Sequence, residues 1–431
     1  MSNPAVNVIT LGCSKNTVDS EHLMAQLENN GLRVLFDSNS TETKTVIINT
    51  CGFIGDAKEE SVNTILGFAA AKTAGTIDRL YVFGCLSQRY PQELTAEIPE
   101  VDRFFGVDST REIVETLGGR YDEKLAQERF LSTPRHYAYL KISEGCNRGC
   151  GYCAIPLIRG KHVSVPIEEL VAEAELLAKK GVKELIVIAQ ETTSYGTDLY
   201  GKSRLAELLK RLAKIGGIEW IRLHYAYPAG FPDDVIATIR EEPKICKYLD
   251  IPFQHIADSQ LRSMRRGVTR ERTYALIEKL RREVPGIALR TTLLTGYSDE
   301  SEGDFKELLQ FVRDVRFERL GVFPYSEEEG TYSALKLKNN IPDAVKHQRA
   351  EAIMALQNGI SEEINQKRIG GVETVIVDRQ EGGQYVGRSQ YDSPEVDAEI
   401  FITSDKPLNI GGFYEVKITS AGDYDLSGMA L

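Results

Sequence analysis

Short apolar runs alternate with longer amphipathic stretches over the first quarter of this chain. The β-rich runs are residues 7–12, 45–50 and 79–84, and the helical stretches include residues 20–31 and 57–75. Because strands that alternate with helices form parallel sheets, this pattern predicts an open parallel α/β domain. A polar, glycine-bearing stretch follows and indicates a linker. We therefore expect the N-terminal domain at residues 1–118 and the linker at 119–135.

A second alternation begins near residue 136. Its strand-like runs are residues 138–143, 184–190, 218–225, 247–254, 287–296 and 318–325. Six β/α units are too few for an eightfold barrel, so we expect a partial barrel whose lateral opening admits a large substrate. Residues 341–371 have the pattern of one long amphipathic helix that closes this domain. We expect the partial (βα)6 barrel to span residues 136–364.

The pattern changes again after Gly371. Short strands separated by glycine-rich turns follow, and they predict a small all-β barrel related to the oligonucleotide-binding type over residues 365–431. The fold class is therefore α/β, with a small β-barrel at the C-terminus.

The composition is that of a globular protein, and it bears on the cellular compartment of the chain. The 431 residues are 42% hydrophobic and 27% charged, with a formal net charge of −11. An acidic chain is poorly suited to bare nucleic acid phosphate. No apolar run is long enough to span a membrane, and no Lys or Arg precedes Cys13 to begin a signal peptide, so we expect a cytoplasmic protein. Seven cysteines in a reducing compartment indicate metal ligands or catalysis.

Three of those cysteines, Cys146, Cys150 and Cys153, fall within the segment EGCNRGCGYC, directly after the first predicted barrel strand. Barrel active sites form at this end of the strands. A structural zinc site takes four ligands, and this segment has three. The C-x3-C-x2-C spacing favours a [4Fe-4S] cluster held by three thiolates, with one iron open to a small molecule. A zinc-stabilised binding module is the alternative.

Three further cysteines each lie just beyond a predicted strand of the N-terminal sheet. They are Cys13, Cys51 and Cys85. Because the C-terminal ends of parallel strands meet at one edge of a sheet, we expect these thiols to converge and to hold a second three-thiolate cluster. The alternative is three unrelated thiols.

The segment GTDLYGKS at residues 196–203 matches the P-loop pattern and ends in Lys202 and Ser203. A true P-loop follows its strand directly, whereas six residues, QETTSY, intervene here. Leu199 and Tyr200 are also bulky for a phosphate-wrapping loop. We interpret the segment as a loop at the barrel mouth, with an NTPase as the alternative.

The sequence resembles the methylthiotransferase family of radical S-adenosylmethionine enzymes over nearly its whole length. The matching motifs are LGCSKN, NTCGF, GCLSQRY and EGCNRGCGYCAIPLIRG, and the terminal β module resembles a TRAM domain. The resemblance implies two [4Fe-4S] clusters and S-adenosylmethionine, which the cluster at Cys146, Cys150 and Cys153 would bind and cleave to a 5′-deoxyadenosyl radical. It also implies an electron donor such as flavodoxin or ferredoxin. Three further positions match its cofactor contacts, Tyr152 near the adenine and Gln190 and Glu191 near the methionine part.

Two branches of that family differ in substrate. One modifies an isopentenylated adenosine in tRNA, and the other an aspartate β-carbon in a small-subunit ribosomal protein. Residues 365–431 hold six basic and eleven acidic residues, a net charge of −5. This charge is ill suited to tRNA and well suited to a basic ribosomal protein. The segment GRSQYDSPEVD also resembles the ribosomal-protein branch, which we therefore expect, with the tRNA branch as the alternative.

Overall fold

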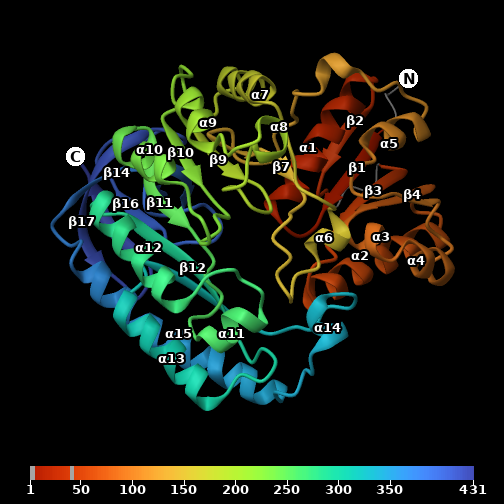
Figure 1. Cartoon of the computed structure of the whole chain (residues 1–431). Coiled ribbons are helices and arrows are strands. Elements are labelled where there is room, and N and C mark those ends of the chain that lie inside the picture. Colours follow the sequence, from red (N-terminus) through yellow and green to blue (C-terminus); the bar gives the residue numbers. More distant parts are fainter. Residues whose placement is uncertain (1–4, 39–42) are drawn as a thin grey trace.

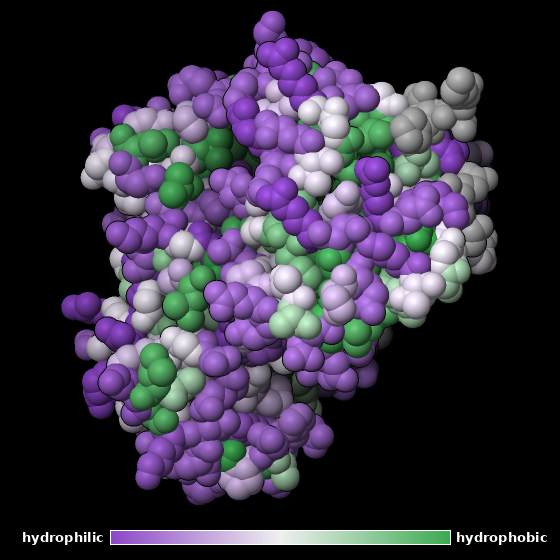
Figure 2. Space-filling view, turned by 90° about the vertical axis from the view of Figure 1, so that its right-hand side faces the viewer, coloured by the Kyte–Doolittle hydropathy of each residue, from purple (hydrophilic) through white to green (hydrophobic). Residues whose placement is uncertain are grey.

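The computed structural model describes residues 5–38 and 43–431 (Figure 1). An N-terminal α/β domain (red and orange) lies beside a partial barrel (yellow to cyan), and a terminal β-barrel (blue) packs on the side of the partial barrel away from the N-terminal domain. Within the described residues, no helix combines the length and apolarity needed to cross a membrane. The surface that Figure 2 faces, on the N-terminal side, is mostly hydrophilic, and its hydrophobic areas are separate.

The N-terminal domain is built on a parallel sheet in the order β2-β1-β3-β4-β5, as predicted. The strands are β1 (Ala5–Thr10), β2 (Arg33–Phe36), β3 (Thr45–Thr50), β4 (Arg79–Gly84) and β5 (Arg103–Phe104). The helices are α1 (Ser14–Asn29), α2 (Gly55–Thr73), α3 (Cys85–Arg89), α4 (Pro91–Glu97), α5 (Thr110–Thr116) and the 3-10 turn η1 (Glu123–Leu125). Apolar side chains on opposite faces of β3 alternate, so Ile47 packs with α1 and Ile48 with α2. The edge strands β2 and β5 escaped prediction because they are short.

The partial barrel has six parallel strands in the order β13-β12-β11-β10-β9-β6, which confirms the predicted architecture. The strands are β6 (Tyr137–Lys141), β9 (Glu184–Ile188), β10 (Trp220–Leu223), β11 (Ile245–Asp250), β12 (Ala288–Thr295) and β13 (Arg319–Pro324). Two short strands, β7 (Ser143–Glu144) and β8 (Val163–Ser164), form a separate ribbon.

This domain also contains helices. They are α6 (Ile155–Ile158), α7 (Ile167–Lys179), α8 (Thr197–Tyr200), α9 (Leu205–Leu212), α10 (Asp233–Glu241), α11 (Asp258–Ser263), α12 (Arg270–Glu283), α13 (Glu302–Val315), α14 (Tyr332–Lys336) and α15 (Asp343–Gln366). Whereas α6 packs on α3, the longer ones cover the outer face of the sheet. Side chains such as Leu140 and Val187 face these helices, whereas Tyr139 and Ile186 face the barrel interior. Successive side chains along each strand therefore point alternately to the helices and to the barrel interior.

The terminal domain is a closed barrel in the order β14-β15-β16-β18-β17. The strands are β14 (Val372–Glu381), β15 (Gln384–Ser389), β16 (Ile400–Thr403), β17 (Phe413–Ala421) and β18 (Leu426–Ala430). The predicted small barrel is confirmed. Strand β18, with sequence LSGMA, was missed because its small residues lack a strand-like apolar alternation.

Residues 390–397, here called the floor loop, connect β15 to β16 and pack inside the partial barrel. Asp392 accepts a hydrogen bond from Nε of Arg319 at 2.9 Å, and Tyr248 donates to Asp397 at 2.7 Å. Ser393 is hydrogen-bonded to His224 at 3.0 Å. Because Arg319 is the first residue of β13, this loop closes the end of the barrel opposite the C-terminal ends of the strands.

The floor loop changes the charge argument made from sequence. Asp392 is buried against Arg319, and the Asp397 side chain is 2% exposed beside Arg290, so neither contributes to the acidic surface. The exposed acids of the terminal domain are Glu381, Glu395, Asp405, Glu415, Asp423 and Asp425, and the exposed bases are Lys367, Lys406 and Lys417. The surface remains acidic, although less than the sequence total indicates.

Candidate metal centres

Cys146, Cys150 and Cys153 lie in the loop that follows β6 and β7, at the C-terminal end of the barrel strands. The preceding Gly145 has φ +73°, and a Cβ there would lie 2.1 Å from the carbonyl oxygen of Lys161. Only glycine fits this close approach. The amide of Cys146 donates to the carbonyl of Gly160 at 3.2 Å. The loop therefore has a fixed backbone before any ligand binds.

Several N–H groups point at the sulfurs of this triad. The amide of Arg148 donates to Sγ of Cys146 at 3.4 Å, and Nη1 of Arg266 donates to Sγ of Cys150 at 3.4 Å. Burial raises the pKa of Cys153 to about 12, and the neighbouring Cys150 adds to that rise. Such thiols stay protonated until a cation arrives, because metal binding releases the proton.

The three predicted cofactor contacts occupy different environments. Glu191 is buried, accepts from Nε of Arg148 at 2.9 Å and from the amide of Thr193 at 2.6 Å, and so holds the cysteine loop. Gln190 donates to Glu144, while its own carbonyl oxygen is buried without a partner.

Tyr152 lies on the far side of the same loop. Its ring meets Tyr297 edge-on at 6.3 Å between ring centroids, and Nη1 of Arg266 lies 3.3 Å from its hydroxyl. Among Tyr152, Gln190 and Glu191, Gln190 has a buried acceptor without a partner. The contacts of these three residues with the cofactor stay predictions.

The second triad lies at the C-terminal edge of the N-terminal sheet. Cys13 precedes α1, Cys51 follows β3, and Cys85 follows β4 as the first residue of α3. Gly12 has φ +91°, and a Cβ there would lie 2.7 Å from Cβ of Cys51, so the Cys13 segment runs directly against Cys51. The pKa of Cys85 is raised to about 11, chiefly by burial, and while Arg159 opposes this rise, Cys13 and Cys51 add to it. The three thiols are close enough to interact electrostatically.

Arg159 joins the two triads. It lies on the barrel side, just after α6, yet its Nε and Nη2 donate to Sγ of Cys85 at 3.3 and 3.2 Å. Nη2 also donates to Asn16 at 2.7 Å, and Nη1 donates to Asp19 at 2.7 Å. The sequence motif contained this residue, but its role was missed. The available signal was a lone cation ending the apolar run AIPLI.

The donor sets suit clusters rather than single ions. Among residues 5–38 and 43–431, no three His, Cys, Asp or Glu side chains converge on one metal-ion position. A [4Fe-4S] cluster spreads its thiolates over different irons, so its ligands need not meet at one point. One triad comes from a single loop and the other from the ends of three strands, and both have N–H groups directed at sulfur. These residues fit a cluster with an open iron.

Other candidate features serve structure. The P-loop-like segment contains the short helix α8, and Asp198 within it accepts from the amide of Ser164 at 2.8 Å, so it packs on β8. Cys246 is buried beside Trp220 in a packed cluster. His255 is fully buried against Glu300.

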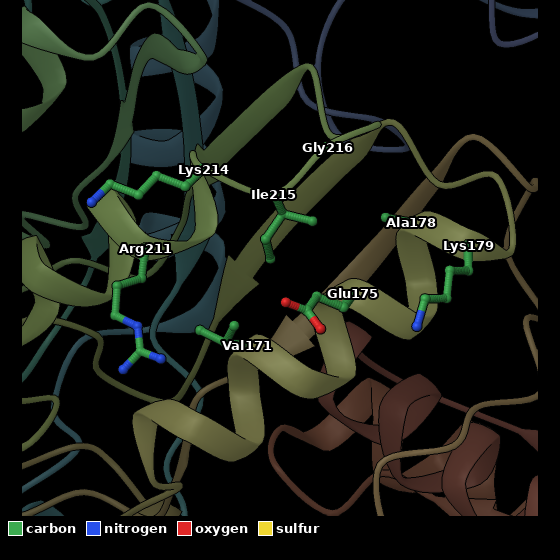
Figure 3. Close-up of a pocket in the computed structure, with 8 residues that line it drawn as sticks. All are labelled: Val171, Glu175, Ala178, Lys179, Arg211, Lys214, Ile215 and Gly216. Atoms are coloured by element: carbon green, nitrogen blue, oxygen red, sulfur yellow. The ribbon is translucent and has the colours of Figure 1, made fainter.

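A groove between α7 and α9 lies on the outer helical layer of the barrel (Figure 3). Glu175 and Lys179 line it from α7, and Arg211 and Lys214 from the α9 side. The groove contains no cysteine, and the cysteine loops lie beyond the strand ends instead. It is not the candidate site.

Three known families match three successive parts of the chain, one in each structural domain. Residues 5–106 match the uncharacterized protein family UPF0004, residues 140–312 match the radical SAM superfamily, and residues 369–431 match the TRAM domain. Radical SAM proteins carry a [4Fe-4S] cluster and S-adenosylmethionine.

Curated relatives match over the full length. The chain is 55% identical to the ribosomal protein uS12 methylthiotransferase RimO of Phocaeicola vulgatus, covering 99% of both chains. It is 52% identical to that of Parabacteroides distasonis, covering 100% of both.

Solved structures share the fold. The radical S-adenosylmethionine methyltransferase TsrM of Kitasatospora setae matches with a TM-score of 0.56 at 14% identity, covering 86% of this chain and 80% of that one. The cobalamin-dependent radical enzyme OxsB matches with a TM-score of 0.52 at 14% identity, covering 82% and 56%.

Proposed function

This chain belongs to the RimO family of radical S-adenosylmethionine methylthiotransferases, and we propose that it attaches a methylthio group to the β-carbon of an aspartate in ribosomal protein uS12. The observation that carries the proposal is the contact of Arg159, which lies in the segment that follows the barrel triad, with Cys85 of the other triad. One triad follows a barrel strand and the other follows strands of the N-terminal sheet, and a single side chain spans from one loop to the other.

The site residues have the following roles in this proposal. Cys146, Cys150 and Cys153 hold the radical cluster. Cys13, Cys51 and Cys85 hold an auxiliary [4Fe-4S] cluster that handles sulfur. When bound, the radical cluster and S-adenosylmethionine supply a 5′-deoxyadenosyl radical that removes hydrogen from the target carbon. Tyr152, Gln190 and Glu191 are the proposed positions around the cofactor.

The protein itself contributes orientation and electrostatics. Arg148 and Arg266 place N–H groups at the sulfurs of Cys146 and Cys150, and such donors stabilise thiolates. Glu191 holds Arg148 in place, so the loop keeps its shape. Arg159 does the same for Cys85 across the domain junction. Both sites are thereby held in fixed positions relative to each other, which radical transfer requires.

The terminal domain is proposed to face the substrate through its acidic surface. Ribosomal proteins are basic, and complementary charge speeds their encounter with an acidic partner. A ribosomal substrate places the reaction in the cytoplasm, and a flavodoxin or ferredoxin would supply electrons. We take residues 1–118, 136–364 and 365–431 as the three domains, with 119–135 as the linker.

Mass spectrometry of ribosomal proteins and digested tRNA from cells with and without this gene tests the proposal. We expect loss of the gene to remove a mass of one methylthio group from uS12 and to leave tRNA nucleosides unchanged. Loss of a methylthio group from a tRNA adenosine, with uS12 unchanged, would overturn the substrate assignment and favour the tRNA branch. The purified protein, reconstituted with iron and sulfide under argon, should then act on the same substrate in vitro.

A further inference from the structure

Lys15 is a buried cation at the entrance to the partial barrel. It is the second residue of α1, two positions after Cys13, and is 7% exposed. Its Nζ lies 2.9 Å from the centroid of the Tyr225 ring, which follows the C-terminal end of β10. Tyr225 packs on the inner face of the barrel with Tyr139 and Ile186. The ammonium therefore reaches from the N-terminal domain into the barrel mouth.

The other buried cations of the described chain have hydrogen-bonding partners. Most are paired with carboxylates: Arg129 with Glu21, Arg159 with Asp19, Arg222 with Glu184, Arg319 with Asp392, Lys346 with Asp343, Arg349 with Glu300 and Arg388 with Glu184. Arg266 has no carboxylate but donates to Cys150 and to the carbonyl of Pro252. Within residues 5–38 and 43–431, the Lys15 ammonium has only the face of Tyr225.

No acid of the described residues pairs with Lys15, and two carboxylates at this end of the barrel bind other groups. Asp250 accepts from Nη1 of Arg290 at 3.0 Å and from the amide of Tyr225 at 3.1 Å. Glu144 accepts from Lys141 at 2.7 Å. A buried lysine is normally paired, since an unpaired charge away from water is costly, and a ring face compensates only part of that cost. An anion that arrives from outside would supply the missing partner.

We propose that Lys15 binds the side-chain carboxylate of the aspartate that is modified. This inference rests on the proposed function, which makes the substrate an aspartate. The β-carbon is bonded directly to the carboxylate carbon, so an ammonium that holds the carboxylate fixes the reacting carbon one bond away. Lys15 also shares its segment with Cys13, a proposed ligand of the auxiliary cluster. The carbon is thereby held near the side from which sulfur comes.

The same contact supplies specificity. A site built around a buried ammonium rejects a substrate that lacks the carboxylate, because the charge would stay unpaired. An asparagine in place of the target aspartate, or the base of an adenosine, offers no carboxylate to Lys15. A second carboxylate in the reaction belongs to the methionine part of S-adenosylmethionine. The test must therefore separate substrate from cofactor.

The experiment is a double-mutant cycle on binding to the reconstituted protein. Dissociation constants are measured for uS12 with its target aspartate, and for uS12 with that residue changed to Asn, against wild-type enzyme and Lys15→Met. We expect Lys15→Met to weaken binding of the aspartate form by about tenfold or more. The Asn form should bind both enzymes with equal, weakened affinity. Lys15→Arg, which keeps the charge, should restore part of the affinity.

Two controls accompany the cycle. Lys214→Met removes the same charge from an exposed position on the outer groove, and it should bind both forms of uS12 with the wild-type dissociation constants. Iron content and the visible absorbance of Lys15→Met report whether both clusters still load. If Lys15→Met fails to load, Lys15→Gln and Lys15→Arg provide the same cycle with a polar chain at the position.

Three results would overturn the assignment. Equal weakening of the aspartate and Asn forms by Lys15→Met would show that Lys15 does not sense the carboxylate. If Lys15→Met binds the aspartate form as tightly as the wild type does, Lys15 does not bind the carboxylate. A tenfold weaker S-adenosylmethionine affinity, with the substrate ratio intact, would assign Lys15 to the cofactor instead. If the wild-type enzyme modifies tRNA and not uS12, the proposed function itself fails and takes this inference with it.

Discussion

The guanidinium of Arg159 donates two hydrogen bonds to Sγ of Cys85, at 3.3 and 3.2 Å. Arg159 belongs to the barrel loop that begins at Cys146, and Cys85 belongs to the N-terminal sheet. A change at Arg159 therefore directly affects a proposed ligand in the other domain. The same guanidinium holds Asp19 of α1 and Glu144 of β7, so it also fastens the two domains together.

Removing this guanidinium should weaken both the fold and the auxiliary site. Arg159→Ala leaves Asp19 with Lys141 as its remaining cation, so we expect a smaller loss than the cost of about 3–5 kcal/mol for breaking a buried pair completely. Urea denaturation should show this loss in the free energy of unfolding, and iron analysis should show fewer than the wild-type number of irons per chain. Arg159→Lys should keep the charge and lose the two-pronged contact, so an intermediate value is expected.

Arg211→Ala is the matched control for that measurement. Arg211 pairs with Glu168 on the exposed outer helices, and surface pairs contribute about 0–1 kcal/mol. A similar loss of stability in both alanine variants would show that Arg159 has no special role at the junction.

Cys150→Ala should abolish cleavage of S-adenosylmethionine, because only two thiolates of the radical triad would remain. The reaction is run with dithionite as reductant, and chromatography measures the 5′-deoxyadenosine formed. Cys246→Ala is the control, since Cys246 is 1% exposed in a packed cluster and touches neither triad. Normal cleavage by Cys150→Ala would contradict the assignment of the radical cluster.

Cys51→Ala should separate the two activities. It removes a ligand from the auxiliary triad and leaves the barrel loop untouched, so 5′-deoxyadenosine should still form. Methylthiolated uS12 should fall below detection by mass spectrometry. Full product from this variant would remove the auxiliary triad from the reaction.

His224 should make stability depend on pH. Burial lowers the pKa of His224 to about 3, from its ordinary 6.5. Between these values the unfolded chain binds a proton that the folded chain does not. The free energy of unfolding therefore falls as the pH drops below 6.5, by at most about 1.4 kcal/mol per pH unit from this residue. Above pH 6.5 this contribution is complete.

Urea titrations at pH 7.5 and 5.5 measure that slope. His224→Gln should show a smaller loss between the two pH values than the wild type. The exposed His347 provides the control, and His347→Gln should keep the wild-type slope. An unchanged slope in His224→Gln would contradict the buried neutral imidazole.

Prediction from sequence succeeded where a local pattern determines structure. The runs 45–50 and 79–84 coincide with β3 and β4, because apolar side chains fill both faces of a buried parallel strand. The cysteines at strand ends could be placed for the same reason, since parallel strands end at one edge. The roles of Arg159 and Lys15 could not be found this way. Each depends on which residue of another domain it meets, and no local pattern records that.

The floor loop also depends on contacts between domains. Arg319, Arg290 and His224 belong to the barrel, yet their partners Asp392, Asp397 and Ser393 come from the terminal domain. The loop that closes one end of the partial barrel thus belongs to the last 67 residues of the chain. Exchanging the terminal domain for that of a relative would leave Arg319 without its anion unless the incoming floor loop carried an acid at the position of Asp392. A substitution on one side of this junction therefore needs a matching residue on the other.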